Sequence, residues 1–317
     1  MAERLLAVQA QDPRGARLAI RARTTGLTTA DVDRALTENR SLVVTWLNRG
    51  TLHLVRSEDY PWLQALTTPP LFAGNARRLA QEGVSPDDAE RGVEAIERAL
   101  AEEGPLTRMQ LRERVRAVGV PAERQALVHV LMLASLRGLV VRGPLVGKHH
   151  AYVLVRDWLG RHRLVDRELA LAELVRRYLV GHGPANERDV AKWAGLPLRD
   201  ARAGLSAISR QLVERDDGLV DLRSRTQVHD LPPPRLLGQF EPVLLGWRSR
   251  EPLVGHHESL LVGGGLFRPF ALVRGRAVAA WRLVDGRVKL EPFAKLSGAE
   301  VAALETDADE LLQFLAG

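Results

Sequence analysis

The clearest repeating pattern of apolar residues begins near Asp166. Five apolar side chains there follow the i, i+3, i+4, i+7, i+8 spacing of a single helix face: Leu171, Leu174, Val175, Tyr178 and Leu179. A second helix is expected over residues 184–193 and a third over 197–210. Gly195 separates them, at a turn where glycine tolerates a left-handed backbone. The β-runs on both sides of residues 216–218 predict a hairpin, which completes the outline of a winged helix.

The same order of elements occurs twice earlier in the chain. In the nearer copy, one helix has an apolar face over residues 89–100, and Thr107 is a candidate N-cap for the next helix. Gly119 ends that helix, and a third helix is expected over residues 121–136, opened by proline. Residues 139–155 predict a long wing, whose tip carries Lys148, His149 and His150.

The first residues of the chain form a looser copy of this unit. Leu5, Leu6 and Val8 are assigned to one helix, and Leu18, Ile20 and Ala22 to a second. Thr28 or Thr29 caps a third helix. β-runs over residues 42–47 and 51–55, joined by Asn48-Arg49-Gly50, predict a hairpin.

The last residues show a different pattern. Short β-runs at 270–273, 277–283 and 288–290 follow a proline-rich linker, and an amphipathic helix closes the chain. A glycine triplet at 263–265 lacks the lysine and hydroxyl residue of a phosphate-binding loop, so it is assigned to a strand connection. We therefore predict an α+β chain. Its domains are three tandem winged-helix units, residues 1–68, 69–157 and 158–229, and a small β-rich domain, residues 230–317.

The composition is that of a globular protein and excludes several kinds of chemistry. Of the 317 residues, 45% are hydrophobic and 26% are charged, which allows a sizeable core. The chain has no cysteine, so disulfides, thiol nucleophiles and thiolate metal sites are excluded. No apolar run approaches the ~18 residues that span a bilayer, and the first ten residues lack the apolar core of a signal peptide. We expect a cytoplasmic, nucleoid-associated protein without a membrane partner.

The charge is basic and unevenly distributed. The formal net charge is +6. Residues 14–23 hold Arg14, Arg17, Arg21 and Arg23 and no acid, whereas the last twenty residues hold five acids and no base. A GC-rich genome, which encodes arginine in place of lysine, would also explain the arginine count. The alternative is a polyanion partner, because arginine forks match phosphate oxygens.

Most enzyme signatures are absent from the sequence. There is no His-Glu-x-x-His metal motif, no Walker loop and no Gly-x-Ser-x-Gly elbow. His149-His150 and His256-His257 are adjacent pairs, whose side chains diverge, so surface histidines are favoured over metal ligands. We expect no metal and no cofactor.

Two glutamines near the N-terminus are the main candidates for chemistry. Because Pro13 disfavours helix at Asp12, the chain should be extended after Gln9, and residues two apart then point the same way. The amides of Gln9 and Gln11 can thus converge on one spot. The structural alternative is that both bond the backbone at a corner while Asp12 caps the next helix. Arg14, Arg17 and Arg21 would line that helix, as a solvated face or a phosphate clamp.

Four segments carry a resemblance to a known family. They read LLAVQAQDPRGARLAIRART, TWLNRGTLHLV, RRYLVGHGPANERDVAKWAGLP and GGGLFRPFALVRGRAVAAW. With these motifs in order over essentially the whole chain, the sequence resembles the bacterial winged-helix DNA glycosylases (AlkZ/YcaQ-like). The resemblance implies a C-shaped arrangement of three winged helices and a barrel-like domain around DNA. Gln9-Ala10-Gln11 matches the catalytic Gln-aliphatic-Gln motif of the AlkZ branch, whereas Asn48 stands where relatives more often carry an apolar residue.

The resemblance implies a monofunctional glycosylase that releases purines alkylated at N7 or N3, with bulky adducts and crosslinks included. Gln9 and Gln11 are the implied catalytic pair, with Asp12 and His53 as candidate supporting residues, although a capping aspartate and a buried, bonded histidine are the structural alternatives. Expected partners are duplex DNA containing alkylated purines and no second subunit. DNA-binding residues are expected to be Arg14, Arg17, Arg21, Arg23, Arg49, Lys148 and His149.

Two readings without catalysis compete with this one. A transcription regulator with tandem winged helices would share the charge and the affinity for DNA. Its third helices would contact bases, for instance through Arg199, Arg202 and Ser206, and it would prefer one undamaged sequence. A damage sensor would use the same surface, with the glutamine pair only a backbone corner.

Overall fold

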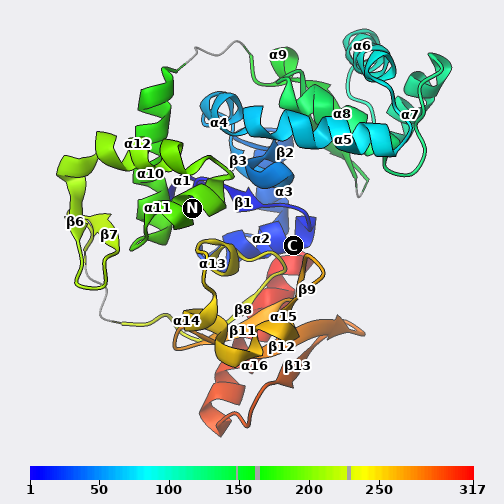
Figure 1. Ribbon diagram of the computed structural model, residues 1–317. Helices are drawn as coiled ribbons and strands as arrows, with labels where there is room; N and C mark the ends of the chain where they lie inside the picture. The colour runs from blue at the N-terminus through cyan, green and yellow to red at the C-terminus, as the bar shows by residue number, and fades with distance from the viewer. Residues whose placement is uncertain (148, 161–164, 227–229) are drawn as a thin grey trace. The chain divides into compact units, whose positions relative to one another are not determined.

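The N-terminal segment is a short helix and a strand before the first long helix. The computed structural model describes residues 1–147, 149–160, 165–226 and 230–317 (Figure 1). Its first elements are α1 (Ala2–Leu5), β1 (Val8–Gln9), α2 (Pro13–Arg21) and α3 (Thr29–Thr37). The first helix ends earlier than predicted, because Leu6 takes a left-handed backbone with φ 62° and the chain then extends. In α3, Val32 and Leu36 are buried, four residues apart on one face of the helix.

A β-hairpin and two helices follow. They are β2 (Leu42–Leu47), β3 (Thr51–Arg56), α4 (Tyr60–Thr67) and α5 (Phe72–Gln81). The hairpin lies where the sequence predicted it, and its turn residues Arg49 and Gly50 have φ 50° and 74°. The helices α4 and α5 were not predicted. One lies just before and the other just after residue 68, where the sequence analysis placed a domain boundary.

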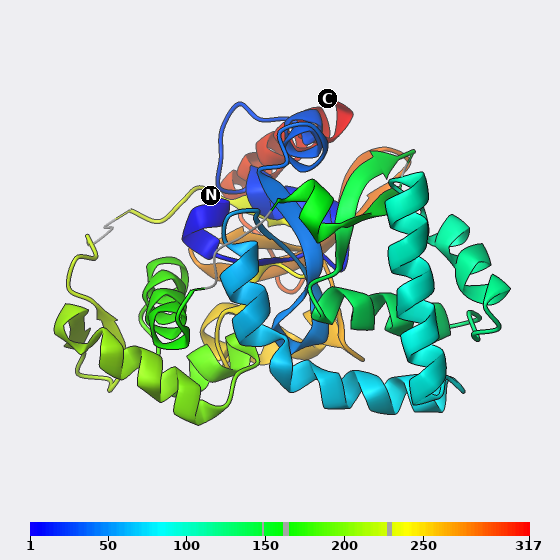
Figure 2. The ribbon, with the colours of Figure 1, turned by 90° about the horizontal axis from the view of Figure 1, so that it is seen from above.

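The next segment has the predicted order of three helices and a wing. Its elements are α6 (Pro86–Glu103), α7 (Arg108–Ala117), α8 (Ala126–Leu136), β4 (Val140–Val146), β5 (His149–Leu154) and α9 (Val155–Trp158). Thr107 caps α7 in a capping box, as expected. Pro121 does not open α8, which begins five residues later because Arg124 has φ 49°. Seen from above in Figure 2, α6 crosses α8, and a Cβ on Gly92 would lie 2.9 Å from Val130, so a glycine permits this close approach.

The third helical segment also confirms the prediction. Its elements are α10 (Arg167–His182), α11 (Glu187–Ala194), α12 (Leu198–Ala207), β6 (Leu212–Glu214) and β7 (Val220–Leu222). All five residues of the predicted α10 face are buried. Gly195 has φ 70°, the left-handed turn that the sequence pattern required. The helix α12 ends at Ala207, three residues before the predicted end, and a 3-10 turn follows over Ser209–Gln211.

The C-terminal segment combines a small antiparallel sheet with a long helix. Its elements are β8 (Arg235–Leu237), α13 (Pro242–Leu245), α14 (Glu251–Val254), α15 (Glu258–Leu261), β9 (Val262–Gly263), β10 (Leu266–Phe267), β11 (Phe270–Val273), β12 (Arg276–Val284), β13 (Arg287–Pro292) and α16 (Gly298–Ala316). The sheet order is β13-β12-β11-β8, and all three predicted β-runs are strands of it. The glycine triplet connects β9 to β10, as predicted. In α16, Leu304, Leu311 and Phe314 are buried, as expected for an amphipathic helix.

Contacts along the chain divide it into two compact units. Unit 1 contains residues 1–32, 172–193 and 197–317, and unit 2 contains residues 33–171 and 194–196. In unit 2, the strands β3, β2, β4 and β5 pair side by side in that order, all antiparallel. Each unit mixes helices and strands, so the fold is of the mixed α/β kind, and the four-domain division stays a prediction. Within the described residues, no helix is long and apolar enough to span a membrane.

Candidate active site

The two candidate glutamines lie at the corner between β1 and α2. Gln9 is the last residue of β1, so the chain is extended up to this residue, whereas Gln11 and Asp12 lie in a bend. Gln9 is buried, with 7% of its surface exposed, whereas Gln11 is exposed to solvent. The corner therefore presents one amide in a largely dry environment and one at the water boundary. Convergence of both amides on one substrate atom stays a prediction.

Asp12 serves as the cap of α2. Its Oδ1 accepts a hydrogen bond of 2.9 Å from the backbone N–H of Arg14, and Pro13 occupies the first helical position. This confirms the capping role that the sequence offered as the alternative to catalysis. Arg14 is exposed on the first turn, and the guanidinium of Arg17 donates to the carbonyl of Pro13 at 2.9 Å.

A close backbone contact fixes the start of α2. A Cβ on Gly15 would lie 2.3 Å from the carbonyl oxygen of Gln239, and one on Gly238 would lie 2.9 Å from the Cα of Gly15. Only glycines at both positions allow the helix to approach the chain just after β8 this closely. The corner that carries Gln9 and Gln11 is thereby held against the C-terminal part of unit 1.

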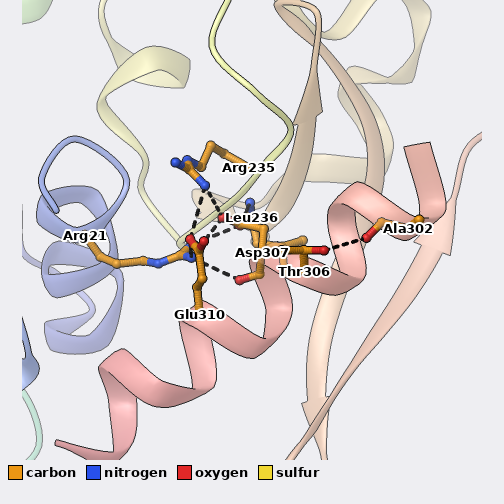
Figure 3. A network of polar contacts seen from close by, with 7 residues as sticks. All are labelled: Arg21, Arg235, Leu236, Ala302, Thr306, Asp307 and Glu310. Atoms are coloured by element: carbon orange, nitrogen blue, oxygen red, sulfur yellow. Dashed lines mark hydrogen bonds and ion pairs between the residues drawn. The ribbon is translucent and has the colours of Figure 1, made fainter. Parts of the chain in front are cut away.

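A buried ion-pair network fixes the other end of α2 (Figure 3). The guanidinium of Arg21 donates to both carboxylate oxygens of Asp307 at 2.9 and 2.8 Å, and Glu310 accepts a further bond at 3.2 Å. Asp307 also accepts bonds from the guanidinium of Arg235 at 2.6 Å and from the backbone N–H of Leu236 at 2.7 Å. Both Arg21 and Asp307 are buried, so this network joins α2, β8 and α16 in a nearly dry environment.

The network corrects the expected phosphate-binding stripe. Arg21 is turned inward to acids of α16, and Arg23 forms an ion pair with Glu241, a residue with no exposed surface. Charges paired in this way hold the unit together, because separating either pair would leave a buried charge uncompensated. We therefore assign Arg21 and Arg23 to the structure, and of the predicted stripe only Arg14 and Arg17 remain as candidates for binding DNA.

His53 is buried in the β2–β3 hairpin of unit 2. It is 2% exposed, lies opposite Thr45, and its Nδ1–H donates to the carbonyl of Thr51 at 3.0 Å. Burial, with a smaller contribution from the charge of Arg49, lowers the pKa of His53 to about 3. The imidazole is therefore neutral near pH 7, which confirms the buried, bonded histidine that the sequence offered as an alternative.

The lowered pKa of His53 predicts acid-sensitive stability. The unfolded state protonates this histidine below about pH 6.5, whereas the folded state does so only near pH 3. Stability should thus fall as the pH drops through this interval, by up to about 1.4 kcal/mol per pH unit. Urea unfolding from pH 7 to 4 should show a shallower loss for His53→Gln than for the wild type. Identical slopes for the two proteins would contradict the prediction.

The turn of the same hairpin contains a buried amide. Asn48 has no exposed surface, and within the described residues neither its Oδ1 nor its Nδ2 has a hydrogen-bond partner. Next to it, Arg49 is half-buried, and a Cβ on Gly195 would lie 2.6 Å from its backbone nitrogen. The turn is thus packed tightly against the glycine that separates α11 from α12.

The wing formed by β4 and β5 carries the remaining candidates. His149 is exposed and pairs with Val146 across the hairpin, while Lys148 lies outside the described residues. Residues at the start of α7 and on the wing, including Arg108, Arg142 and His149, line a pocket of about 540 Å³. Among the described residues, no group of histidines and acids is placed to hold a metal ion.

Comparison with known proteins assigns this fold to a class of DNA-repair enzymes. Residues 2–314 match the family model described as DNA glycosylase AlkZ-like. The chain belongs to this family, which confirms the resemblance seen in the sequence motifs.

Similarity to a protein and to a solved structure, both from one organism, agrees with this assignment. An interstrand DNA cross-link repair glycosylase of Streptomyces sahachiroi is 27% identical over 326 residues, which cover 96% of this chain and 87% of that protein. The solved structure of the Streptomyces sahachiroi DNA glycosylase AlkZ is similar with a TM-score of 0.82 and 26% identity, over 98% of this chain and 89% of the other.

Proposed function

We propose that the protein is a monofunctional glycosylase that hydrolyses the N-glycosidic bond of purines alkylated at N7 or N3. We include bulky adducts and interstrand crosslinks among its substrates, since a relative with 27% identity is an interstrand DNA cross-link repair glycosylase. The observation that carries the proposal is the Gln9-Ala10-Gln11 corner, where the two polar side chains of the motif are amides and not acids. Asp12, the carboxylate that follows the motif in the sequence, is used as a helix cap.

Amides suffice when the leaving base already carries a positive charge. Most N-glycosidic bonds need a general acid to protonate the base as it departs. In a purine alkylated at N7 or N3, the electron pair of the breaking C1′–N9 bond neutralises the cationic base, so no proton is required. A water oxygen then bonds to C1′ and releases its proton to solvent. Amide oxygens of Gln9 and Gln11 can hold this water and face the oxocarbenium-like sugar.

We propose that the chain holds DNA with three winged-helix units and a β-rich C-terminal domain. The same β-bridge between a helix-connecting loop and the following wing occurs in two helical segments and supports this proposal. Leu106, in the loop after α6, bridges to Tyr152 of the β4–β5 wing, and Ala185, in the loop after α10, bridges to Val220 of the β6–β7 wing. A short strand between the first two helices that pairs with the wing is a regular feature of winged helices. The proposed phosphate contacts are Arg14, Arg17, Arg49, Lys148 and His149.

The charge of the leaving base provides the test of function. We expect free base from duplexes that contain N7-methylguanine, a bulky N7 adduct or an N7-linked crosslink, and none from a uracil-containing duplex, because neutral uracil requires protonation or comparable help. Released bases would be measured by mass spectrometry. Release of uracil at a comparable rate, or no release of any alkylated base by the folded protein, would overturn the proposal. Tight binding to one undamaged sequence would then favour a regulator.

A further inference from the structure

A pocket outside the glutamine corner occurs within unit 1. It has a volume of about 920 Å³ and is lined by residues of α11, α13 and α14 and of the loops beside them. This volume falls within the range of small-molecule binding sites. Its walls combine apolar side chains, such as Val243 and Leu253, with an indole and two exposed cations. None of these residues belongs to the catalytic motif or to the ion-pair network of α2.

The indole is held in place by the surrounding structure. The Nε1–H of Trp247 donates to the carbonyl of Pro184 at 3.1 Å. The Trp247 ring packs edge-on against the buried ring of His182, with 5.7 Å between the ring centroids. A Cβ on the preceding Gly246 would lie 2.5 Å from the His182 ring, so the loop backbone is pressed against this cluster. Trp247 is half-buried, which leaves part of a rigid aromatic surface in the pocket wall. Such a surface can stack a planar base with little loss of conformational entropy.

The two cations are Lys192 and Arg248. Within the described residues, Arg248 is held by hydrogen bonds of its backbone and not of its guanidinium. The backbone N–H of Arg248 donates to Oδ1 of buried Asp189 at 2.9 Å, and its carbonyl accepts from Nζ of Lys192 at 3.2 Å. Asp189 also accepts from the backbone of Asn186, so this carboxylate is occupied by backbone donors. Lys192 and the Arg248 guanidinium are exposed at the pocket, and both present positive charge to a ligand.

We propose that this pocket binds one unstacked nucleotide of a DNA strand, with its base on Trp247 and its phosphate at Lys192 and Arg248. A nucleotide uses the aromatic wall and the cations together, because it carries a planar ring beside a phosphate. An enzyme that opens a damaged duplex exposes unpaired nucleotides next to the lesion, and this pocket would retain one of them. The inference rests on the DNA partner of the proposed function, but not on the chemistry of Gln9 and Gln11.

The test uses the full chain and single-stranded pentathymidylate as the probe. With tryptophans replaced by 5-fluorotryptophan, the fluorine signal that Trp247→Phe removes is assigned to Trp247, and it should shift as the pentamer is added. Lys192→Glu/Arg248→Glu should weaken pentamer affinity by about tenfold or more. The matched control, Lys289→Glu/Arg287→Glu, makes the same charge changes on exposed β13 residues of unit 1 and should lower affinity at most twofold. Circular dichroism would confirm that each variant is folded.

Each other result would overturn the proposal. If the pentamer binds without moving the Trp247 signal, or if both double variants lose affinity equally, the strand lies elsewhere. If thymidine monophosphate binds as tightly as the pentamer, the occupant is a free nucleotide and not a strand. Base release from N7-methylguanine duplexes is measured separately. A shifted Trp247 signal without base release would sustain the pocket and reject the glycosylase, and the converse result would do the opposite.

Discussion

Gln9→Ala and Gln11→Ala are each expected to slow release of N7-methylguanine from duplex DNA by about 10²- to 10³-fold, the usual effect of removing one group that stabilises transition-state charge. Gln9 is the more buried of the two, so its amide acts where water screens charge least, and its loss should cost the most. Base release would be followed under single-turnover conditions, so that DNA binding and chemistry are separated. Affinity for the same duplex should change little.

The control for these variants is Gln125→Ala, which removes an exposed glutamine from the residue before α8 and should leave the rate unchanged. Circular dichroism and thermal unfolding would confirm that Gln9→Ala is folded, because that side chain is buried. If the double alanine variant released base at the wild-type rate, the glutamines would be no more than a backbone corner.

Asp307→Ala should lower the free energy of unfolding by about 3–5 kcal/mol, the range found when one partner of a buried ion pair is removed. Asp307 accepts hydrogen bonds from Arg21, Arg235 and the backbone of Leu236. Its loss leaves the backbone donor unpaired and leaves both guanidinium groups with the exposed Glu310 as their remaining acidic partner in this network. Because Arg21 belongs to α2, the variant should also release base more slowly than the wild type at temperatures where both are folded. Asp307 would then act as a positioning residue for the glutamine corner.

The matched control is Asp309→Ala, which removes an exposed carboxylate two residues away on the same helix. We expect its unfolding free energy to remain within about 0.5 kcal/mol of the wild type. Urea denaturation at low and at high salt would separate the two variants further, since a buried pair is screened much less than a surface charge. A loss below about 1 kcal/mol for Asp307→Ala would mean that the network does not anchor α2.

Local features of the sequence predicted most of the elements. The apolar face of α10, the Thr107 capping box and the left-handed turn at Gly195 all lie where the pattern placed them. Each depends on residues within a few positions of one another, so the sequence alone carries the information. Two failures occurred where a single backbone angle interrupted the pattern: Leu6 ends α1 early, and Arg124 delays the start of α8.

For the candidate site, the sequence predicted which residues belong to it, but not how they are packed. The motif, the extended chain at Gln9 and the cap at Asp12 follow from adjacent residues, and the sequence motifs are sufficient to indicate the family. The pocket beside Trp247 gave no signal in the sequence, because its walls come from α11 and from a loop some 60 residues further along the chain. The difference in exposure between Gln9 and Gln11 was equally unpredictable, since packing by distant segments determines it.

The sequence by itself determined the order of the helices and strands, the family and the amide motif, because helix period, capping and turn preference act over a few residues. The partners of its charges were decided only by the tertiary structure. The separation of front arginines from C-terminal acids suggested a face for nucleic acid, yet Arg21 binds Asp307 across 286 residues of sequence. Long-range ion pairs depend on where folded segments meet, and charge counting along the chain does not contain that information.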